Sequence, residues 1–296
     1  MKPTIIGNAH DLNAVQETWF IQNILFSGSI INIGYSPELL NDQAIIYLEL
    51  NEISGELIQH LRLNKKKIVL YHMADEHGRM SRAQYQNCDL VIRNYFFEEI
   101  ITNKEGVEVM WAPCGFKTGV GPRAAGNIKM ASQRQWLSAF LGWLNNSDSY
   151  HGERESFSRM APECGEDLFL QSTAGFTQGW STSLYSIAME SCVFAPCPAG
   201  NAPETIRLYD ALEVGCIPIS LHHEFLVSAK ALGLIGPVPF PILNSWDELP
   251  TFLKTMKNKM LTTPSEINEM QARCIAWWAD YKYAIQQKIA SRINAL

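Results

Sequence analysis

The chain has 296 residues, which suits two compact domains better than one. Apolar residues make up 47% of it and charged residues 18%, a composition that excludes an intrinsically disordered protein. The formal net charge of −6 argues against a nucleic acid as the main partner, because such binding depends mostly on Lys and Arg contacts to phosphates.

The first half of the chain alternates short apolar strands with helical segments. Apolar runs that predict strands lie at residues 4–6, 30–33, 44–50, 68–72, 89–93 and 107–111. The spacing of apolar residues predicts helices over residues 16–25 and 55–64. Strands and helices that alternate in this way form parallel βαβ units. We therefore expect an N-terminal, acceptor-side domain over residues 1–125.

The stretch 117–134 contains three glycines and a proline with few apolar residues, and it predicts a linker between domains. Beyond it, strands are expected at residues 135–143, 193–196 and 217–221, with helices over 154–160, 183–191, 205–214, 246–260 and 265–296. Gly215 is placed to end the helix 205–214. These elements predict a second, donor-binding domain over residues 126–270. We expect the segment 271–296 to pack back toward the N-terminal domain.

Residues 193–220 carry the main functional signal, because a buried strand leads through a Pro- and Gly-containing turn into a helix and another strand. Ligands of open α/β sheets bind at the carboxyl ends of strands. Gly200 allows close backbone approach to a ligand, and the helix start near Glu204 and Thr205 favours a diphosphate. Arg207 lies one turn into the helix, and an arginine side chain can donate two parallel hydrogen bonds to phosphate oxygens.

Two acidic residues of the same helix, Asp210 and Glu213, are placed to accept hydrogen bonds from ribose or sugar hydroxyls. A plainer interpretation also holds at this point. An Arg three residues before an Asp on one helix face is commonly a surface ion pair, as Arg207 and Asp210 would then be.

The same stretch resembles the signature of the exostosin-like glycosyltransferases, glycosyltransferase family 47, in its bacterial form. The matching residues are Cys197-Pro198, Gly200, Arg207-Leu208-Tyr209-Asp210-Ala211-Leu212-Glu213 and Gly215-Cys216-Ile217-Pro218. Weaker similarities lie at residues 72–76, 92–95, 113–116, 140–142 and 277–278. Two residues depart from the pattern, since Ala199 stands where the family usually has Arg and Asp210 where it usually has Glu.

This resemblance implies a GT-B fold, which is an α/β fold of two Rossmann-like domains with parallel sheets facing an interdomain cleft. It also implies an inverting transfer from a nucleotide-sugar donor, UDP-sugar before GDP-sugar, to a hydroxyl acceptor such as a glycan. No bound metal or other cofactor is expected, and the sequence has no Asp-x-Asp motif. The donor-binding residues implied are Arg154, Gly200, Asn201, Glu204, Thr205, Arg207, Asp210 and Glu213.

Candidates for the catalytic base follow the predicted strand 68–72, where Asp75 and Glu76 are adjacent. Neighbouring carboxylates on one loop do not both point inward, so one is the candidate base, and Asp75 has the alternative role of capping a following helix. His72 and Arg93 end strands on the same side and are candidate contacts for the acceptor or a phosphate. His72 is otherwise a structural residue, and Arg93 otherwise pairs with Asp75.

The seven cysteines show no C-x-x-C spacing and predict a reducing, cytoplasmic compartment. We expect neither a signal peptide nor a membrane span, since no apolar run approaches roughly 20 residues. Peripheral association with a membrane stays open, and the sequence predicts no oligomeric state. Two alternatives to a transferase also stay open: a non-catalytic nucleotide-sugar-binding module, and a sugar-nucleotide hydrolase or epimerase on the same fold.

Overall fold

The computed structural model describes residues 4–7, 15–28, 30–33, 44–49, 54–102, 106–175 and 178–296. The chain forms two compact units. Unit 1 consists of Met1–Cys114, Ser228–Ile235 and Tyr281–Leu296, and unit 2 consists of Gly115–Val227 and Gly236–Asp280. The break therefore falls after Cys114 and not at residue 125, and the stretch 117–134, expected as a linker, lies inside unit 2.

The described strands of unit 1 form one parallel sheet in the order β2-β1-β3-β4-β5-β6. Their bounds are β1 (Thr4–Gly7), β2 (Ile30–Ile33), β3 (Ala44–Glu49), β4 (Lys67–His72), β5 (Leu90–Arg93) and β6 (Val109–Trp111). The helices are α2 (Thr18–Phe20), which continues into a π-helical turn (Ile21–Leu25), α3 (Gly55–Leu63) and α4 (Glu98–Ile101), with a 3-10 turn at Tyr85–Asn87.

The core of unit 1 forms where α3 covers the sheet. Ile58 and Leu61 of α3 are fully buried against Ile68 and Leu70 of β4. The near-continuous apolar run of β4 follows from this position, because a central parallel strand is buried on both faces. At the start of α3, the Ser54 hydroxyl accepts a hydrogen bond from a backbone amide and caps the helix.

The described strands of unit 2 form a second parallel sheet in the order β11-β10-β9-β7-β8. Their bounds are β7 (Trp136–Gly142), β8 (Phe169–Ser172), β9 (Cys192–Pro196), β10 (Ile217–Leu221) and β11 (Ile242–Leu243). The helices are α5 (Glu153–Met160), α6 (Thr182–Glu190), α7 (Ile206–Glu213), α8 (Glu224–Val227), α9 (Leu249–Thr262) and α10 (Pro264–Asn294). The α/β fold with parallel sheets predicted from the sequence is confirmed.

Helix α7 connects β9 to β10, and its residues from Arg207 to Glu213 are buried. It ends as the sequence predicts, because Gly215 follows the C-cap residue Val214 and has φ = 67°, in the left-handed region that favours glycine. A Cβ at this position would also lie 2.4 Å from a side-chain carbon of Ile128. Gly215 thus allows a tight return of the chain into β10.

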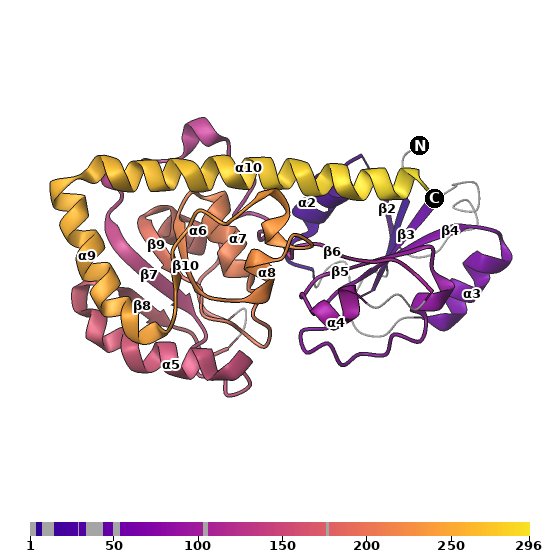
Figure 1. Cartoon of the computed structure of the whole chain (residues 1–296), viewed down its shortest axis with the longest axis horizontal. Coiled ribbons are helices and arrows are strands. Elements are labelled where there is room, and N and C mark those ends of the chain that lie inside the picture. The colour runs from indigo at the N-terminus through magenta and orange to yellow at the C-terminus, as the bar shows by residue number, and fades with distance from the viewer. Residues whose placement is uncertain are drawn as a thin grey trace. The chain divides into compact units, whose positions relative to one another are not determined.

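Helix α10 is the long helix that ends the chain (Figure 1). Its residues to Asp280 belong to unit 2, and those from Tyr281 belong to unit 1. Within unit 1, the Tyr281 hydroxyl donates to the carbonyl of Ala231 at 3.4 Å, and Arg292 pairs with Glu108 at 3.1 Å. No helix in the described part of the chain combines the length and the apolar character that crossing a bilayer requires.

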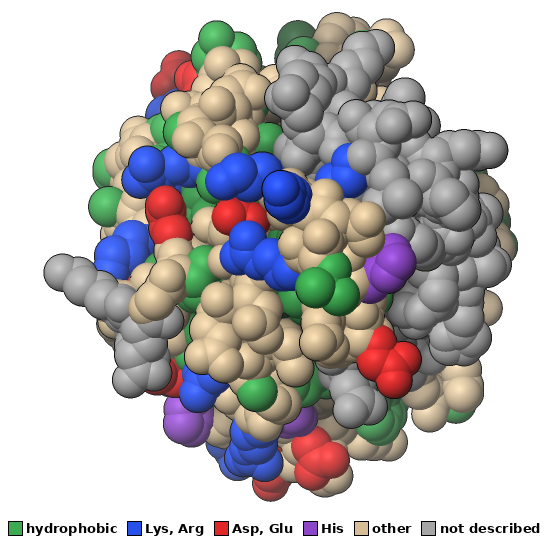
Figure 2. Space-filling view, turned by 90° about the vertical axis from the view of Figure 1, so that its right-hand side faces the viewer, with side chains coloured by type: hydrophobic (Ala, Val, Ile, Leu, Met, Phe, Trp, Pro, Cys, Tyr) green, Lys and Arg blue, Asp and Glu red, His purple; other side chains and the backbone are tan. Residues whose placement is uncertain are grey.

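Figure 2 shows one face of the molecule, on which Lys and Arg side chains are interspersed with Asp and Glu side chains where the residues are described. Among the described residues of unit 1, Arg62 and Lys67 both lie within 3.6 Å of Asp89.

Candidate functional site

The candidate donor site lies at the carboxyl ends of β7 and β9 in unit 2. β9 pairs with β7 on one side and with β10 on the other, so the loops that follow these strands emerge at one edge of the sheet. The loop after β9 carries Gly200 and Asn201 and leads into α7. This is the edge where ligands of parallel α/β sheets bind.

Arg207, in the first turn of α7, is buried and points to the end of β7. Its Nη1 donates to the carbonyl oxygen of Leu141 at 2.8 Å, and its Cζ lies 4.1 Å from the ring centroid of Phe140. A Cβ on residue 142 would lie 2.3 Å from Arg207 Nη2, so Gly142 leaves the space that the guanidinium occupies. The Nε of Arg207 is buried and has no hydrogen-bond partner among the residues that the structure describes.

Arg154, near the start of α5, reaches the same ring from another element. Its Nε donates to the carbonyl of Ala199 at 3.0 Å, and its Nη1 donates to the carbonyl of Trp143. Its Cζ lies 5.5 Å from the centroid of Phe140. The side chain therefore joins the loops after β7 and β9, and its Nη2 lies beside Gly200.

The two guanidinium groups form a site of concentrated positive charge. Burial, and next the positive charge of Arg207, lower the pKa of Arg154 to about 9. Arg154 contacts two backbone carbonyls, Arg207 contacts one, and both cations contact the Phe140 ring, whereas neither has a carboxylate at hydrogen-bond distance within the described part of the chain. Two buried like charges destabilise each other, and an anion bound to both relieves that repulsion. The arrangement fits a group with two or more negative oxygens.

Glu153, the residue before Arg154, binds the same residue of the loop after β9. Its Oε2 accepts hydrogen bonds from the Ala199 amide at 3.0 Å and from Trp246 Nε1 at 3.4 Å. Its Oε1 lies 3.0 Å from Nε2 of His223, which follows β10. The N–H and the C=O of Ala199 are thus held by consecutive residues of α5. No local sequence pattern indicates this role of Glu153.

The other predicted residues of the loop also lie at this edge. The backbone carbonyl of Gly200 accepts from the Tyr150 amide at 2.6 Å, and Asn201 Oδ1 accepts from Asn146 Nδ2 at 2.9 Å. Glu204 is buried, and its Oε1 accepts from a tyrosine hydroxyl of α7. Thr205 is the N-cap residue of α7, but its side chain makes no capping hydrogen bond.

Asp210 and Glu213 are both buried and bind groups of unit 2. Asp210 Oδ1 accepts from the Lys117 amide at 2.8 Å, and its carboxyl is also hydrogen-bonded to Tyr185. Glu213 accepts from the Arg123 amide and from Trp278 Nε1, each at 2.8 Å. Burial above all raises the pKa of Asp210 to about 6. A role for the two carboxylates in binding hydroxyls of the donor stays a prediction.

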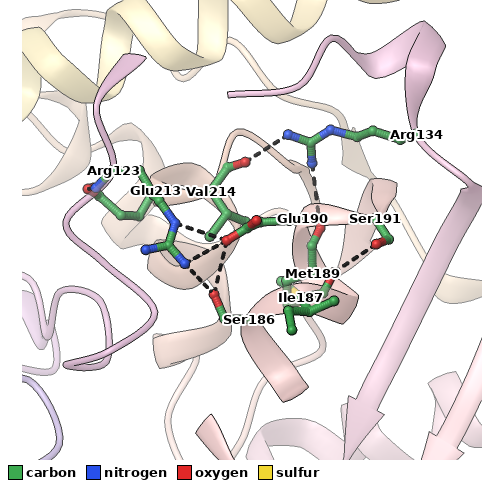
Figure 3. Close-up of polar contacts among 9 residues, drawn as sticks. All are labelled: Arg123, Arg134, Ser186, Ile187, Met189, Glu190, Ser191, Glu213 and Val214. Atoms are coloured by element: carbon green, nitrogen blue, oxygen red, sulfur yellow. Dashed lines mark hydrogen bonds and ion pairs between the residues drawn. The ribbon is translucent and has the colours of Figure 1, made fainter. Parts of the chain in front are cut away.

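Two arginines of the expected linker contact α6 and the end of α7 (Figure 3). Arg123 donates to Glu190 Oε1 at 2.6 Å and to the Ser186 hydroxyl at 2.8 Å, both on α6. Arg134 donates to the carbonyl of Val214 at 2.7 Å, where α7 ends, and approaches the carbonyl of Met189 at the end of α6. Cations stabilise the carboxyl ends of helices in this way. The sequence alone showed only a stretch poor in apolar residues.

In unit 1, Asp75 forms a buried ion pair with Arg93. Asp75 Oδ2 lies 3.2 Å from Arg93 Nη2, and the two side chains are 3% and 0% exposed. Asp75 Oδ1 accepts hydrogen bonds from the amides of Arg79 and Met80 at 2.9 and 3.1 Å. Both oxygens of Asp75 thus hold its own loop and the neighbouring strand, which matches the structural alternatives for Asp75 and Arg93. Roles in catalysis or acceptor binding stay predictions.

His72, at the end of β4, is buried with Tyr85. The Nδ1 of His72 and the Tyr85 hydroxyl are 2.7 Å apart, whereas Nε2 has no partner among the described residues. Burial, and next the charge of Arg93, lower the pKa of His72 to about 4. The imidazole is therefore neutral near pH 7, and a contact from it to the acceptor stays a prediction.

Glu76 is the more accessible of the two adjacent carboxylates. It is half-buried, whereas Asp75 is buried, and its Oε1 accepts from the Tyr95 hydroxyl at 3.1 Å. Tyr95 follows β5, the strand beside β4. Within the described part of the chain, no group of three or more His, Cys, Asp and Glu side chains is placed to hold a metal ion.

The fold is that of the GT-B glycosyltransferases. HepE from Anabaena, solved in complex with UDP, is similar in structure with a TM-score of 0.58, and the alignment covers 100% of both chains at 10% sequence identity. Sucrose-phosphate synthase from Thermosynechococcus elongatus aligns over 100% of both chains with a TM-score of 0.54 and 10% identity. HepE in complex with UDP-glucose gives a TM-score of 0.51 at 11% identity, again over 100% of both chains.

The sequence identifies the family within this class. The model of the RXYLT1 C-terminal domain matches residues 122–295, more than half of the chain, and the chain belongs to that family. Human ribitol-5-phosphate xylosyltransferase 1 is 24% identical over 184 residues, which cover 55% of this chain and 39% of the human protein. The Danio rerio protein of the same name is 24% identical over 173 residues, which cover 52% of this chain and 37% of that protein. The alignments thus span well under half the length of these relatives.

Proposed function

We propose that unit 2 binds the diphosphate of a nucleotide sugar on the guanidinium groups of Arg154 and Arg207, and that the chain transfers the sugar to a hydroxyl acceptor. The observation that carries this proposal is the pair of buried guanidinium groups on the ring of Phe140, at the carboxyl ends of β7 and β9. A pyrophosphate has enough oxygens to satisfy both cations, and Arg suits such planar, paired contacts.

The comparisons support the same ligand class. A structural neighbour is solved with UDP and with UDP-glucose, and the curated relatives are named xylosyltransferases. We propose UDP as the nucleotide, with GDP second, and xylose as the first sugar to test. The finer assignment to the exostosin-like family rests on the signature around Arg207 and is part of the proposal. The seven cysteines are buried and none forms a disulfide with another described residue, which supports the reducing, cytoplasmic compartment that we propose.

The proposed reaction is a single displacement that inverts the anomeric carbon. The acceptor hydroxyl loses its proton to a carboxylate, and its oxygen forms a bond to the anomeric carbon. The bond between that carbon and the diphosphate oxygen breaks, and the electron pair leaves with the nucleotide diphosphate. Arg154 and Arg207 stabilise the negative charge that develops on the leaving oxygen. We propose that these cations supply this stabilisation without a bound metal ion.

A turnover assay tests the proposal. Release of the nucleoside diphosphate is measured, UDP from UDP-xylose and UDP-glucose and GDP from GDP-mannose. Each donor is tested with water alone and with a panel of ribitol-phosphate, monosaccharide and oligosaccharide acceptors. A sugar–acceptor product in one of these mixtures is expected, and Arg207→Ala should abolish it. Arg159→Ala, an exposed residue of α5, is the matched control. Release without any transfer product would identify a hydrolase, and donor binding without turnover would identify a non-catalytic module.

A further inference from the structure

The loops that follow β7 and β9 meet where the direction of the chain along the sheet of unit 2 reverses. From β7 the chain continues through α5 to β8 on one side, whereas from β9 it continues through α7 to β10 on the other side. Ligands of open α/β sheets bind at such a switch point, beside the carboxyl ends of the two strands. The Tyr150 amide of the first loop donates to the Gly200 carbonyl of the second at 2.6 Å, so Tyr150 lies at this point.

Tyr150 is also adjacent to the proposed diphosphate site. Arg154 donates to the Ala199 carbonyl, and its Nη2 lies 3.8 Å from the position that a Cβ on Gly200 would take. Tyr150 and Arg154 therefore contact consecutive residues of the loop after β9. One ribose joins the base of a nucleotide to its diphosphate. A base beside Tyr150 and a diphosphate on Arg154 can thus belong to one ligand.

Aromatic side chains cluster around Tyr150. The ring centroids of Tyr150 and His151 are 4.0 Å apart, and the ring of His223, which follows β10, lies 6.0 Å from that of Tyr150. The ring of Phe225 stacks on that of His223. Tyr150 is half-buried and His151 is exposed, so the cluster remains accessible. An aromatic ring that its neighbours hold in place and that is still accessible is a surface on which a nucleobase stacks.

The backbone beside Tyr150 is strained. His151 has φ = 49°, in the left-handed region that residues with a Cβ rarely adopt, and Gly152 follows with φ = 68°. The Gly152 amide donates to the Ser149 carbonyl at 3.0 Å, and the Ser149 hydroxyl accepts from the Arg154 amide at 3.3 Å. These bonds tie the turn to the start of α5. Strained residues persist where the surrounding structure holds them, and they gather at ligand sites.

We propose that the nucleobase of the donor stacks on the ring of Tyr150. This inference rests on the proposed function, because it assigns a second part of the same nucleotide to a residue beside the diphosphate site. Tyr150, Arg154 and Arg207 all belong to unit 2. Every nucleobase has a flat π-face, so the Tyr150 ring contributes to the affinity for a uracil or a guanine nucleotide. It contributes nothing to the binding of a diphosphate that carries no base.

Binding measurements separate the base from the diphosphate. UDP and inorganic pyrophosphate are titrated by calorimetry into the unmodified protein, into Tyr150→Phe, which keeps the ring, and into Tyr150→Leu, which keeps an apolar side chain without a ring. Tyr283→Leu is the control, because Tyr283 is a tyrosine of unit 1 that is 65% exposed. Arg207→Ala reports on the diphosphate site, and thermal unfolding shows whether each variant is folded.

Tyr150→Leu should weaken UDP binding by about tenfold or more, which is the usual effect of losing one stack between a base and an aromatic ring, and leave pyrophosphate binding unchanged. Tyr150→Phe and Tyr283→Leu should bind both ligands as the unmodified protein does, whereas Arg207→Ala should weaken both. A further measurement needs no variant. In saturation-transfer NMR on the unmodified protein, irradiation of aromatic protons should transfer to the uracil protons of bound UDP.

Full UDP affinity in Tyr150→Leu would overturn this inference, as would the absence of saturation transfer to uracil. An equal loss of UDP and pyrophosphate binding in Tyr150→Leu would overturn it too, because Tyr150 would then act on the loop and not on the base. So would a tenfold loss in Tyr150→Phe, since the hydroxyl and not the ring would then make the contact.

An unmodified protein that binds neither ligand would contradict the donor site on Arg154 and Arg207, and the base subsite with it. If both ligands bind and only the Tyr150 variants fail to behave as expected, the base subsite alone is wrong. None of these measurements needs turnover. A failure of the proposed transfer reaction is therefore told apart from a failure of this inference.

Discussion

The guanidinium groups of Arg154 and Arg207 lie on the same aromatic ring, with their Cζ atoms 5.5 and 4.1 Å from the centroid of Phe140. The ring offers its negative face to a cation. Arg207 also donates to the carbonyl of Leu141 in β7, and Arg154 donates to the carbonyls of Trp143 and Ala199, which follow β7 and β9. These contacts fix both guanidinium groups in place, and on the proposed function they would do so before an anionic ligand binds.

Gly142→Ala should weaken UDP binding by at least about tenfold while leaving most of unit 2 folded. A Cβ at this position would lie 2.3 Å from Arg207 Nη2, so the guanidinium must leave its place beside the end of β7. Loss of one charged hydrogen bond costs about 1.5–3 kcal/mol, which sets the expected factor. Calorimetric titration with UDP measures the change. Gly126→Ala is the control, since a Cβ there meets nothing within 4 Å. If Gly142→Ala bound UDP as tightly as the unmodified protein, the place of the Arg207 guanidinium beside residue 142 would not matter for UDP binding.

Glu153→Gln should loosen the loop after β9. The substitution removes the negative charge and replaces one carboxylate oxygen by an NH₂ group. The side chain then loses either the acceptor for the Ala199 amide or the charged oxygen that lies 3.0 Å from His223 Nε2. We expect hydrogen exchange at the Ala199 amide to become about tenfold faster and UDP affinity to fall several-fold. Glu155→Gln, on the exposed side of the same helix, should change neither quantity. If the Ala199 amide of the variant exchanged its hydrogen as slowly as in the unmodified protein, Glu153 would not fix the loop after β9.

The sequence predicts much of the fold because buried parallel strands leave a plain signal. β4 and β10 are apolar runs bounded by polar residues, and both lie within one residue of their expected bounds. β8 (Phe169–Ser172) escaped prediction because it is an edge strand, and Leu170, Gln171 and Ser172 are exposed. Its residues therefore carry neither the apolar run nor the alternation that marks a strand.

The candidate site is predictable only in part. The motif points to Arg207, and the structure places Arg154 beside it, a pairing that no local pattern specifies because the two residues are 53 positions apart. The hydrogen bonds of Glu153 with Ala199, and of Arg134 with the ends of α6 and α7, likewise join residues far apart in the sequence. Such contacts depend on tertiary packing, and sequence spacing does not record them.

Asp210 should make the protein less stable as the pH rises from about 4 to about 6. Burial raises the pKa of Asp210 from 3.8 to about 6, so the folded chain keeps this proton over a range where the unfolded chain has lost it. The free energy of unfolding therefore decreases with pH in this window, by on the order of 2 kcal/mol between pH 4.5 and 7. Asp210→Asn should lack this component, as urea unfolding at both pH values would show. Equal pH dependence in the variant and the unmodified protein would contradict the assignment.

Ala74→Gly should leave unit 1 as stable as before or stabilise it slightly. The left-handed conformation at φ = 61° costs a residue with a Cβ about 1–2 kcal/mol, which glycine avoids. Glycine also makes the unfolded chain more flexible, and this stabilisation of the unfolded state offsets about 0.4–1 kcal/mol of the gain. Thermal unfolding measures the balance. Ala284→Gly, in the interior of α10, should instead cost about 1 kcal/mol. Equal losses in the two variants would mean that Ala74 carries no strain.

Calorimetric titration of UDP into the unmodified protein, Arg154→Ala, Arg207→Ala and the control Arg159→Ala tests the donor site most directly. The account predicts that UDP binds the unmodified protein and the control alike, and that each of the other two variants loses at least about tenfold in affinity, because each removes a charged contact to the diphosphate. Equal affinity in all four proteins, with the variants still folded, would contradict the account.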